Sequence, residues 1–387
     1  MRPPGTAAPE WLTRAQVEFY ESVVRFAKTL PDDVRDRDEA GAFSRDIWNR
    51  CATFGIQGMP VPEELGGGGH DVLTTMLGLE ALGYGYPDQG LIFAINAHMW
   101  TSEISLWRFG TPEQQQAWLP RLCSGEAIGC HAITEPEAGS DAFNLAATAR
   151  EVEGGFVLNG GKTFISNAPV ADVFIVFARS GAGIGPFGIS AFLLRKGVSG
   201  MEVGKPLEKM GLRTSPMAEV FLRDCFVPAE DLVGKPGQGG EIFTESMRWE
   251  RACIMASHVG LMRRTLETCV AYARQRRQFG KPIAKYESIS DKLANMKIAL
   301  DAAHLLLLRT GWLMDQGRDA MTEAAVAKAF ISEATVQSQL DAIQIHGGYG
   351  YMSELGIERG LRDAIGGRIY SGTSEIQRRI IARGLGL

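Results

Sequence analysis

The stretch GFVLNGGKTFISNA, at positions 155–168, marks the point at which the sequence changes from a helical to a β pattern. Two short apolar runs flank Asn159-Gly160, a dipeptide that favours the two-residue turn of a β-hairpin. Two continuous apolar runs follow, DVFIVFARS at 172–180 and ISAFLLR at 189–195, which are typical of strands buried on both faces. We therefore predict a hairpin at Asn159-Gly160 and a β domain around it.

Helical patterns lie on both sides of this β region. Positions 10–125 contain short periodic segments separated by proline and glycine breaks. After Gly240, apolar residues recur every three or four positions, which indicates long, antiparallel, packed helices. We expect an α+β multi-domain protein with an N-terminal helical domain (1–125), a middle β-barrel-like domain (126–236) and a C-terminal four-helix bundle (237–387). The apolar positions that we expect to face the core of that bundle are Ala252, Met255, Val259, Met262, Leu266, Cys269 and Ala273 on its first long helix, Ile289, Leu293, Met296, Leu300, Ala303 and Leu307 on the second, and Val326, Phe330 and Ala334 on the third.

The composition narrows the class of protein. Of the 387 residues, 45% are hydrophobic and 22% are charged, as in ordinary globular proteins. The net charge of −5 argues against a nucleic-acid partner, and no apolar run reaches the about 18 residues that span a membrane. The first residues lack the apolar core of an export signal. The six cysteines form no CxxC pair, so we expect reduced thiols, no metal site and a cytoplasmic protein.

Two glycine-rich stretches raise the alternative of a Rossmann phosphate loop, EELGGGGHD at 63–71 and IHGGYGYMSE at 345–354. That loop must follow a strand and open a helix. The first stretch lies between helical patterns and the second follows a helix end, so we interpret both as connections.

Two further stretches are compatible with a bound anion. ITEPEAGSDAFNL, at 133–145, is a polar loop whose hydroxyls and backbone N–H groups could face an anion or a flat polar ring, or form an ordinary turn. ARQRRQFGKPI, at 273–283, ends a helix with several cations. These cations either complement the helix end or hold a phosphate group.

The order of the motifs ITEPEAGSD, GGKTFISNA, RQRRQFGKPI, IQIHGGYGYMSE and IYSGTSEIQRRIIAR resembles that of the acyl-CoA dehydrogenases, from about residue 12 to the C-terminus. The resemblance implies an FAD enzyme that removes an α proton from an acyl thioester and passes the β hydrogen to the flavin as hydride. It also implies electron transfer to an electron-transfer flavoprotein and a homodimer or homotetramer.

The resemblance also implies the positions of the cofactor contacts. Thr134 and Ser140 match residues at the isoalloxazine and the pyrophosphate, and Phe164 and Ser166 match an aromatic shield and a hydroxyl near N5. Thr373 and Glu375 match residues at the FAD of their own subunit. The residues that match contacts to the FAD of a neighbouring subunit are Arg276, Gln278, Phe279, Gln344, Gly347 and Gly348.

The base of the reaction is displaced in this sequence. Most members of the family carry a glutamate in a Tyr-Glu-Gly-Thr turn, where this chain has Ser371, and a serine hydroxyl is a poor base near neutral pH. We expect Ser371 to offer only its backbone N–H to the thioester oxygen. Isovaleryl and long-chain members place the glutamate directly before an arginine on the first long C-terminal helix, as in Glu250-Arg251. Burial there would make Glu250 a better base, and the alternative is a surface Glu-Arg pair.

We expect Arg248, Arg251 and Gly372 to contact the substrate. Arg248 stands where many relatives have an aspartate that touches pantetheine, which leaves both coenzyme A and an acidic acyl carrier protein open as carriers. The sequence thus predicts FAD-dependent α,β-dehydrogenation of an acyl thioester with Glu250 as base. Two alternatives remain, a flavin monooxygenase on the same fold and a silent thioester-binding homologue.

Overall fold

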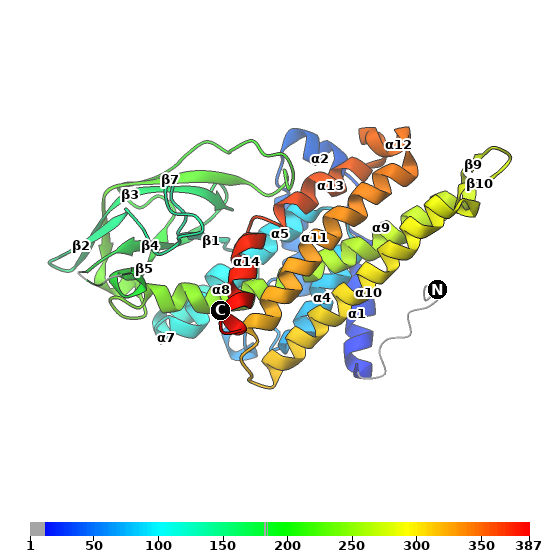
Figure 1. Cartoon of the computed structure of the whole chain (residues 1–387). Coiled ribbons are helices and arrows are strands. Elements are labelled where there is room, and N and C mark those ends of the chain that lie inside the picture. Colours follow the sequence, from blue (N-terminus) through cyan, green and yellow to red (C-terminus); the bar gives the residue numbers. More distant parts are fainter. Residues whose placement is uncertain (1–11, 182, 184) are drawn as a thin grey trace.

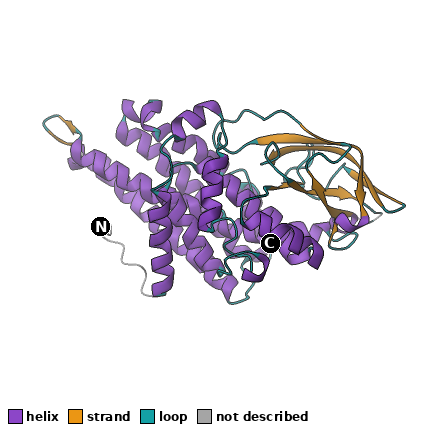
Figure 2. Cartoon of the chain, turned by 180° about the vertical axis from the view of Figure 1, so that it is seen from behind, coloured by secondary structure: helices purple, strands orange, loops and turns teal. Residues whose placement is uncertain are grey.

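The computed structural model describes residues 12–181, 183 and 185–387. Most of the stretch in which we looked for an export signal lies outside these residues. The chain runs through helices, then strands, then helices again (Figure 1), which confirms the order that we predicted. Seen from behind, the strands of the large sheet are gathered at one end and the helices form an elongated body at the other, with one small hairpin at its far tip (Figure 2).

The N-terminal helices form one part of the helical body. Capping boxes fix the starts of two of them, with Thr13 paired to Gln16 and Thr111 paired to Gln114. The helices are α1 (Arg14–Ala27), α2 (Val34–Ala40), α3 (Arg45–Phe54), α4 (Val72–Gly85), α5 (Gln89–His98), α6 (Ile104–Phe109) and α7 (Pro112–Cys123), with one π-helical turn at Met99–Glu103. Helix α4 is buried on nearly all sides because α1 and α9 (Ala256–Gln275) both pack against it.

The middle of the chain forms one eight-stranded sheet. Its strands are β1 (Gly129–Ala132), β2 (Thr148–Val152), β3 (Gly155–Ser166), β4 (Val173–Arg179), β5 (Ile189–Arg195), β6 (Met201–Val203), β7 (Met217–Pro228) and β8 (Leu232–Val233). Their order is β6-β7-β3-β2-β4-β5-β8, and β1 pairs with β4 in parallel. Within the described residues the end strands β6 and β8 do not pair with each other, so the hydrogen-bonded path is open and does not close into the expected barrel.

Strand β4 confirms the prediction of strands buried on both faces. Phe174 and Val176 enter the core on one side of the sheet, whereas Ile175 and Phe177 enter a separate core on the other. This alternation explains why the sequence shows a continuous apolar run and no apolar–polar alternation.

The predicted hairpin at Asn159-Gly160 is wrong. Strand β3 continues through both residues and pairs with β7 on either side of a register shift between Leu158 and Gly160. Gly160 has φ 147°, and a Cβ there would lie 2.5 Å from that of Ala147. The Asn159 side chain bonds the backbone and side chain of Asp224 on β7. These residues therefore form a bulge that brings two backbones close together, and no turn.

The C-terminal part consists of helices with one small hairpin. The elements are α8 (Gly239–Cys253), α9, α10 (Glu287–Asp315), α11 (Met321–His346), α12 (Gly348–Tyr351), α13 (Ile357–Gly366) and α14 (Ser374–Gly384), and the hairpin strands are β9 (Arg277–Gln278) and β10 (Lys281–Pro282). Helices α9, α10 and α11 pack on one another, and α14 packs along α11. The first predicted seam is interrupted at residues 254–255, so Ala252 belongs to α8, Met255 lies in the break, and the remaining positions belong to α9.

The seam predicted for α11 points away from the core. Phe330 is 38% exposed, and Val326 and Ala334 are only partly buried. The buried face of this helix instead carries Ala327 and Ile331. Apolar residues at helical spacing therefore mark two faces of α11, of which one lies open in a groove shared with α10 and α14.

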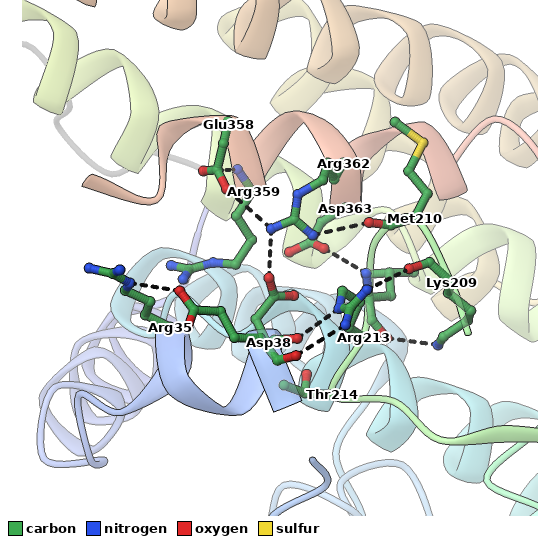
Figure 3. Close-up of polar contacts among 12 residues, drawn as sticks. Arg35, Asp38, Lys209, Met210, Arg213, Thr214, Glu358, Arg359, Arg362 and Asp363 are labelled. Atoms are coloured by element: carbon green, nitrogen blue, oxygen red, sulfur yellow. Dashed lines mark hydrogen bonds and ion pairs between the residues drawn. The ribbon is translucent and has the colours of Figure 1, made fainter. Parts of the chain in front are cut away.

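A polar junction ties the three parts of the chain together (Figure 3). Arg362 of α13 bonds Asp38 of α2 at 2.6 Å, and Arg213 of the loop before β7 bonds the Asp38 carbonyl at 2.7 Å. Asp363 accepts a hydrogen bond from the Leu212 backbone at 2.6 Å. These bonds fix α13 against the sheet region, and the turn that follows α13 is thereby held in place.

Candidate active site

The structure joins the predicted base to the Ser371 turn. Glu250, near the end of α8, is only 6% exposed, which excludes a surface Glu-Arg pair. The Ser371 hydroxyl donates to Oε1 of Glu250 at 2.6 Å. Oε2 is buried and has no partner among the described residues. We had expected only the backbone N–H of Ser371 to matter, and the structure adds its side chain.

The turn that carries Ser371 has an unusual backbone. Ser371 has φ 55° and Gly372 has φ 88°, both in the left-handed region, which is unfavourable for serine. Lys328 of α11 donates to the Gly372 carbonyl at 2.6 Å, and Gln377 of α14 donates to it at 2.8 Å. Gln377 and Arg251 also donate to the Ser371 carbonyl, at 3.1 and 3.4 Å. These donors hold the turn from three helices.

The surroundings of Glu250 act on its pKa in opposite directions. Burial raises the pKa of Glu250, while the Ser371 hydrogen bond and the charges of Arg251 and Lys328 act to lower it. Burial lowers the pKa of Lys328 to about 8. Burial therefore has the largest effect on the pKa of Glu250, and the hydroxyl and the two cations oppose it.

Tyr370, directly before Ser371, forms a second polar pair with the buried His258. The Tyr370 hydroxyl and Nε2 of His258 are 3.2 Å apart, and burial lowers the pKa of His258 to about 4. The imidazole is therefore neutral near pH 7. Phe93 packs against Tyr370 with ring centroids 4.6 Å apart.

Arg248 lies two residues before Glu250 on α8 and is partly exposed. It bonds Glu245 at 3.4 Å, and the Trp249 indole donates to the same carboxylate at 3.0 Å. Arg108 of α6 approaches Glu245 to 4.0 Å. The structure thus brings two partly exposed arginines together around Glu245, five residues before Glu250 on α8.

The polar loop with Thr134 and Ser140 is held by a buried ion pair. Lys162 of β3 donates to Oε1 of Glu135 at 2.6 Å, and both side chains are almost fully buried. Glu135 also accepts from the backbone of Ala146 at 2.6 Å, at the far end of the loop. Thr134 stays partly exposed and Ser140 exposed, so the loop presents hydroxyls while its base is fixed.

Phe164 is held outward by the backbone. It lies at a second register shift of β3 with φ 57°, and its side chain is 63% exposed. Ser166 ends the strand, and the Asn167 amide anchors it by donating to the Ala94 carbonyl of α5 at 2.9 Å. An exposed aromatic ring on a strained backbone, near the hydroxyls of Ser166 and Thr134, is suited to cover one face of a flavin.

Other predicted cofactor residues lie at the opposite end of the molecule. Phe279, at the tip of the β9-β10 hairpin, is 95% exposed with φ 47°. Arg276 lies over the ring of Tyr349 at 5.9 Å, next to the exposed residues Gln344, Gly347 and Gly348. Helix α9, 20 residues long, separates this group from α8 by about 30 Å.

Thr373 and Glu375 lie at the start of α14. The Thr373 hydroxyl caps the helix by accepting from the Ile376 backbone at 3.4 Å, and Glu375 is exposed. The predicted cofactor residues thus include two separate groups, one around Phe164 and the Thr134 loop and the other around Arg276 and Phe279.

Three side chains of the site were missed from the sequence. Lys328 and Lys162 are lysines inside otherwise apolar stretches, AVAKAFI and KTFI, and such a position is a usable signal for a buried partner. Gln377 carries no comparable signal, because the carbonyls of Ser371 and Gly372 to which it donates point toward it only when the turn has folded.

Comparison with known proteins covers nearly the whole chain. Three family profiles match, described as "Acyl-CoA dehydrogenase, N-terminal domain" at residues 13–126, "middle domain" at 130–225 and "C-terminal domain" at 237–386. Within the described residues no helix is long and apolar enough to cross a membrane.

Individual relatives match over similar lengths. The chain is 44% identical to the L-prolyl-[peptidyl-carrier protein] dehydrogenase of Serratia sp. (strain ATCC 39006), covering 97% of this chain and 98% of that protein. The solved structure "PigA with FAD and proline" has a TM-score of 0.96 at 43% identity, covering 98% and 99% of the two chains. The prolyl acyl carrier protein oxidase AnaB has a TM-score of 0.95 at 44% identity, covering 97% and 100%.

Proposed function

The chain belongs to the acyl-CoA dehydrogenase family, and from this premise we propose that it dehydrogenates a carrier-bound acyl thioester at the α and β carbons. FAD is the cofactor, and when bound it accepts the β hydrogen as hydride. Glu250 takes the α proton on Oε2. The buried carboxylate with one oxygen bonded to Ser371 and the other without a partner is the observation that carries the proposal.

We propose an aminoacyl group, of the prolyl type, on a carrier protein as the substrate. Two relatives that are 44% identical to this chain are L-prolyl-[peptidyl-carrier protein] dehydrogenases. Arg248 and Arg108, two partly exposed arginines beside Glu245 on α8, support this choice, because cations suit an acidic carrier surface and a phosphopantetheine phosphate. The tryptophans next to Glu250 favour a small acyl group, since Trp249 stacks on the buried Trp100 at 6.2 Å.

The separation of the two groups of cofactor residues supports a site shared between subunits. Phe164 belongs to β3 and Arg276 follows the end of α9 next to β9, and Figure 1 shows β3 and β9 at opposite ends of the molecule, so one chain does not bring both residues to the same FAD. The exposed Phe279 and the open apolar face of α11 are surfaces that a second copy would cover. We therefore propose a homodimer or homotetramer, with Arg276 at the partner's FAD and an electron-transfer flavoprotein as acceptor. A cytoplasmic location stays a prediction.

Anaerobic bleaching of the bound FAD tests the proposed function. Prolyl, other aminoacyl and plain acyl groups would be offered on a peptidyl carrier protein and on coenzyme A. We expect bleaching with the carrier-bound prolyl group. Oxygen consumption driven by an external reduced flavin would indicate a monooxygenase, and FAD that stays oxidised with every thioester would indicate a silent binding protein.

A further inference from the structure

The side chain of Ser371 has a role that a glycine or alanine could not fill. We propose that Ser371 is a positioning residue, whose hydroxyl holds Oε1 of Glu250 so that Oε2 is turned toward the α carbon of the substrate. This inference rests on the proposed function of Glu250 as base, and it concerns which oxygen takes the proton and how that oxygen is held.

The length of the bond indicates its character. The two oxygens of Ser371 and Glu250 are 2.6 Å apart, in the range of hydrogen bonds that a hydroxyl makes to an ionised carboxylate. A carboxyl group otherwise rotates over a broad range about its last bond. One short bond to Oε1 removes that freedom and leaves Oε2 buried and unpartnered among the described residues.

The backbone conformation at Ser371 is one that glycine adopts more readily than serine, so the serine there needs a reason. The left-handed region is unfavourable for a non-glycine residue, and Ser371 has φ 55°. Lys328, Gln377 and Arg251 bond only the carbonyls of this turn and hold it in that conformation. The turn is thus fixed from outside in the one conformation that places the hydroxyl on Glu250.

The other charged groups near Glu250 do not replace this bond. Arg251 on α8 and Lys328 on α11 influence Glu250 by charge, but their hydrogen bonds go to the turn. Tyr370 bonds His258 of α9, and burial keeps both neutral. Among the described residues, Ser371 is therefore the one direct hydrogen-bond donor to this carboxylate.

The sign of the pH effect follows from the direction of the bond. Ser371 donates to the ionised form of Glu250 and so lowers its pKa against the effect of burial. Without the hydroxyl the pKa of Glu250 rises, and less of the base is ionised at low pH. The acid limb of the FAD reduction rate must then move to higher pH.

The test compares Ser371→Ala with Ser371→Gly in the FAD-loaded protein. Both remove the hydroxyl, but only glycine relieves the backbone. Infrared titration reads the carboxylic-acid band that is absent in Glu250→Gln, and stopped-flow measures FAD reduction by the carrier-bound thioester across pH. We expect both variants to raise the pKa of Glu250 and to slow reduction about tenfold or more below the limb, as for a lost hydrogen bond to a charged group.

An unchanged Glu250 band in both variants would overturn the positioning role, as would a pH-independent loss of rate confined to Ser371→Ala. The proposed base is tested separately. If Glu250→Gln reduces FAD at the wild-type rate, Glu250 is not the base, whatever the infrared band shows about its bond to Ser371.

Discussion

The two ends of helix α9 offer opposite kinds of site. At its start, the Ser371 hydroxyl donates to Oε1 of the buried Glu250 within the same chain, and Oε2 of Glu250 has no partner among the described residues. At its end, Arg276 and Phe279 project from the molecule, and Phe279 is 95% exposed. The first group of residues is joined by hydrogen bonds within one chain, whereas the second presents an exposed arginine over Tyr349 and an exposed aromatic ring.

This difference teaches which part of the activity depends on assembly. Proton removal needs a carboxylate of adjusted pKa, which burial within one chain supplies. Under the proposed function, the exposed donors at the second end contact the FAD of a partner subunit, so their part in cofactor binding depends on assembly. We expect substitutions at the first end to change chemistry without changing assembly, and substitutions at the second end to change both.

The largest expected effect comes from Glu250→Gln, which keeps the shape of the base but removes its charge. FAD reduction by the thioester should slow by about 10² to 10⁴-fold, the usual contribution of a general base, while FAD binding and solution mass stay unchanged. Glu241→Gln, at an exposed residue two turns earlier on α8, is the matched control. A wild-type rate in Glu250→Gln would place the base elsewhere.

Adding Ser371→Glu to Glu250→Gln sharpens this result. The Ser371 hydroxyl already touches Glu250, so a carboxylate on this turn starts close to the lost one and should restore part of the rate. Ser371→Glu alone puts two carboxylates together, and one of them should stay protonated at neutral pH. A failed rescue would mean that the turn cannot reach the substrate, and it would leave Glu250 as the base.

Lys162→Met should show that the sheet side of the cofactor site also depends on buried charge. It leaves Glu135 unpaired in the core, and breaking a buried pair in this way costs about 3–5 kcal/mol. We expect a large drop in the midpoint of denaturant unfolding, with weaker FAD binding because the Thr134 loop loosens. Lys196→Met, at an exposed position just after β5, should leave the midpoint almost unchanged.

Arg276→Ala tests the exposed end directly. Losing hydrogen bonds to a phosphate group should weaken FAD binding by about 10- to 100-fold, and the protein should shift toward smaller assemblies in analytical ultracentrifugation. Arg274→Ala, two residues earlier and also exposed, is the control. If FAD affinity and mass are unchanged, Arg276 only complements the helix end and packs on Tyr349.

The smallest effect is expected from Thr373→Ala. The hydroxyl caps α14, so its loss should lower stability by about 1 kcal/mol even after FAD is removed, and Thr373→Ser should restore it. If Thr373 also contacts the cofactor, FAD affinity falls in addition. No change in the unfolding midpoint of the FAD-free protein would contradict the capping role.

The general order of helices, sheet and helices followed from local periodicity, and so did the buried strands β4 and β5. The hairpin at Asn159-Gly160 and the seam at Phe330 were predicted wrongly, because in both places distant parts of the chain decide the structure. Asn159-Gly160 forms a bulge because β7 pairs with both halves of β3, and strand pairing across about 60 residues leaves no mark on a dipeptide. The apolar seam at Phe330 is real in the sequence but faces an open groove, because α11 has two apolar faces.

The sequence by itself determined the chemistry that is available: a glutamate directly before an arginine at Glu250, a serine where a carboxylate is usual at Ser371, and cations at Arg276. It also determined the family, because several motifs occur in a fixed order. Only the tertiary structure decided that the Ser371 hydroxyl meets Glu250, 121 residues away. Periodicity states which face of a helix is buried, but a 2.6 Å contact depends on how α8, α11 and α14 pack, and that packing is a property of the whole fold.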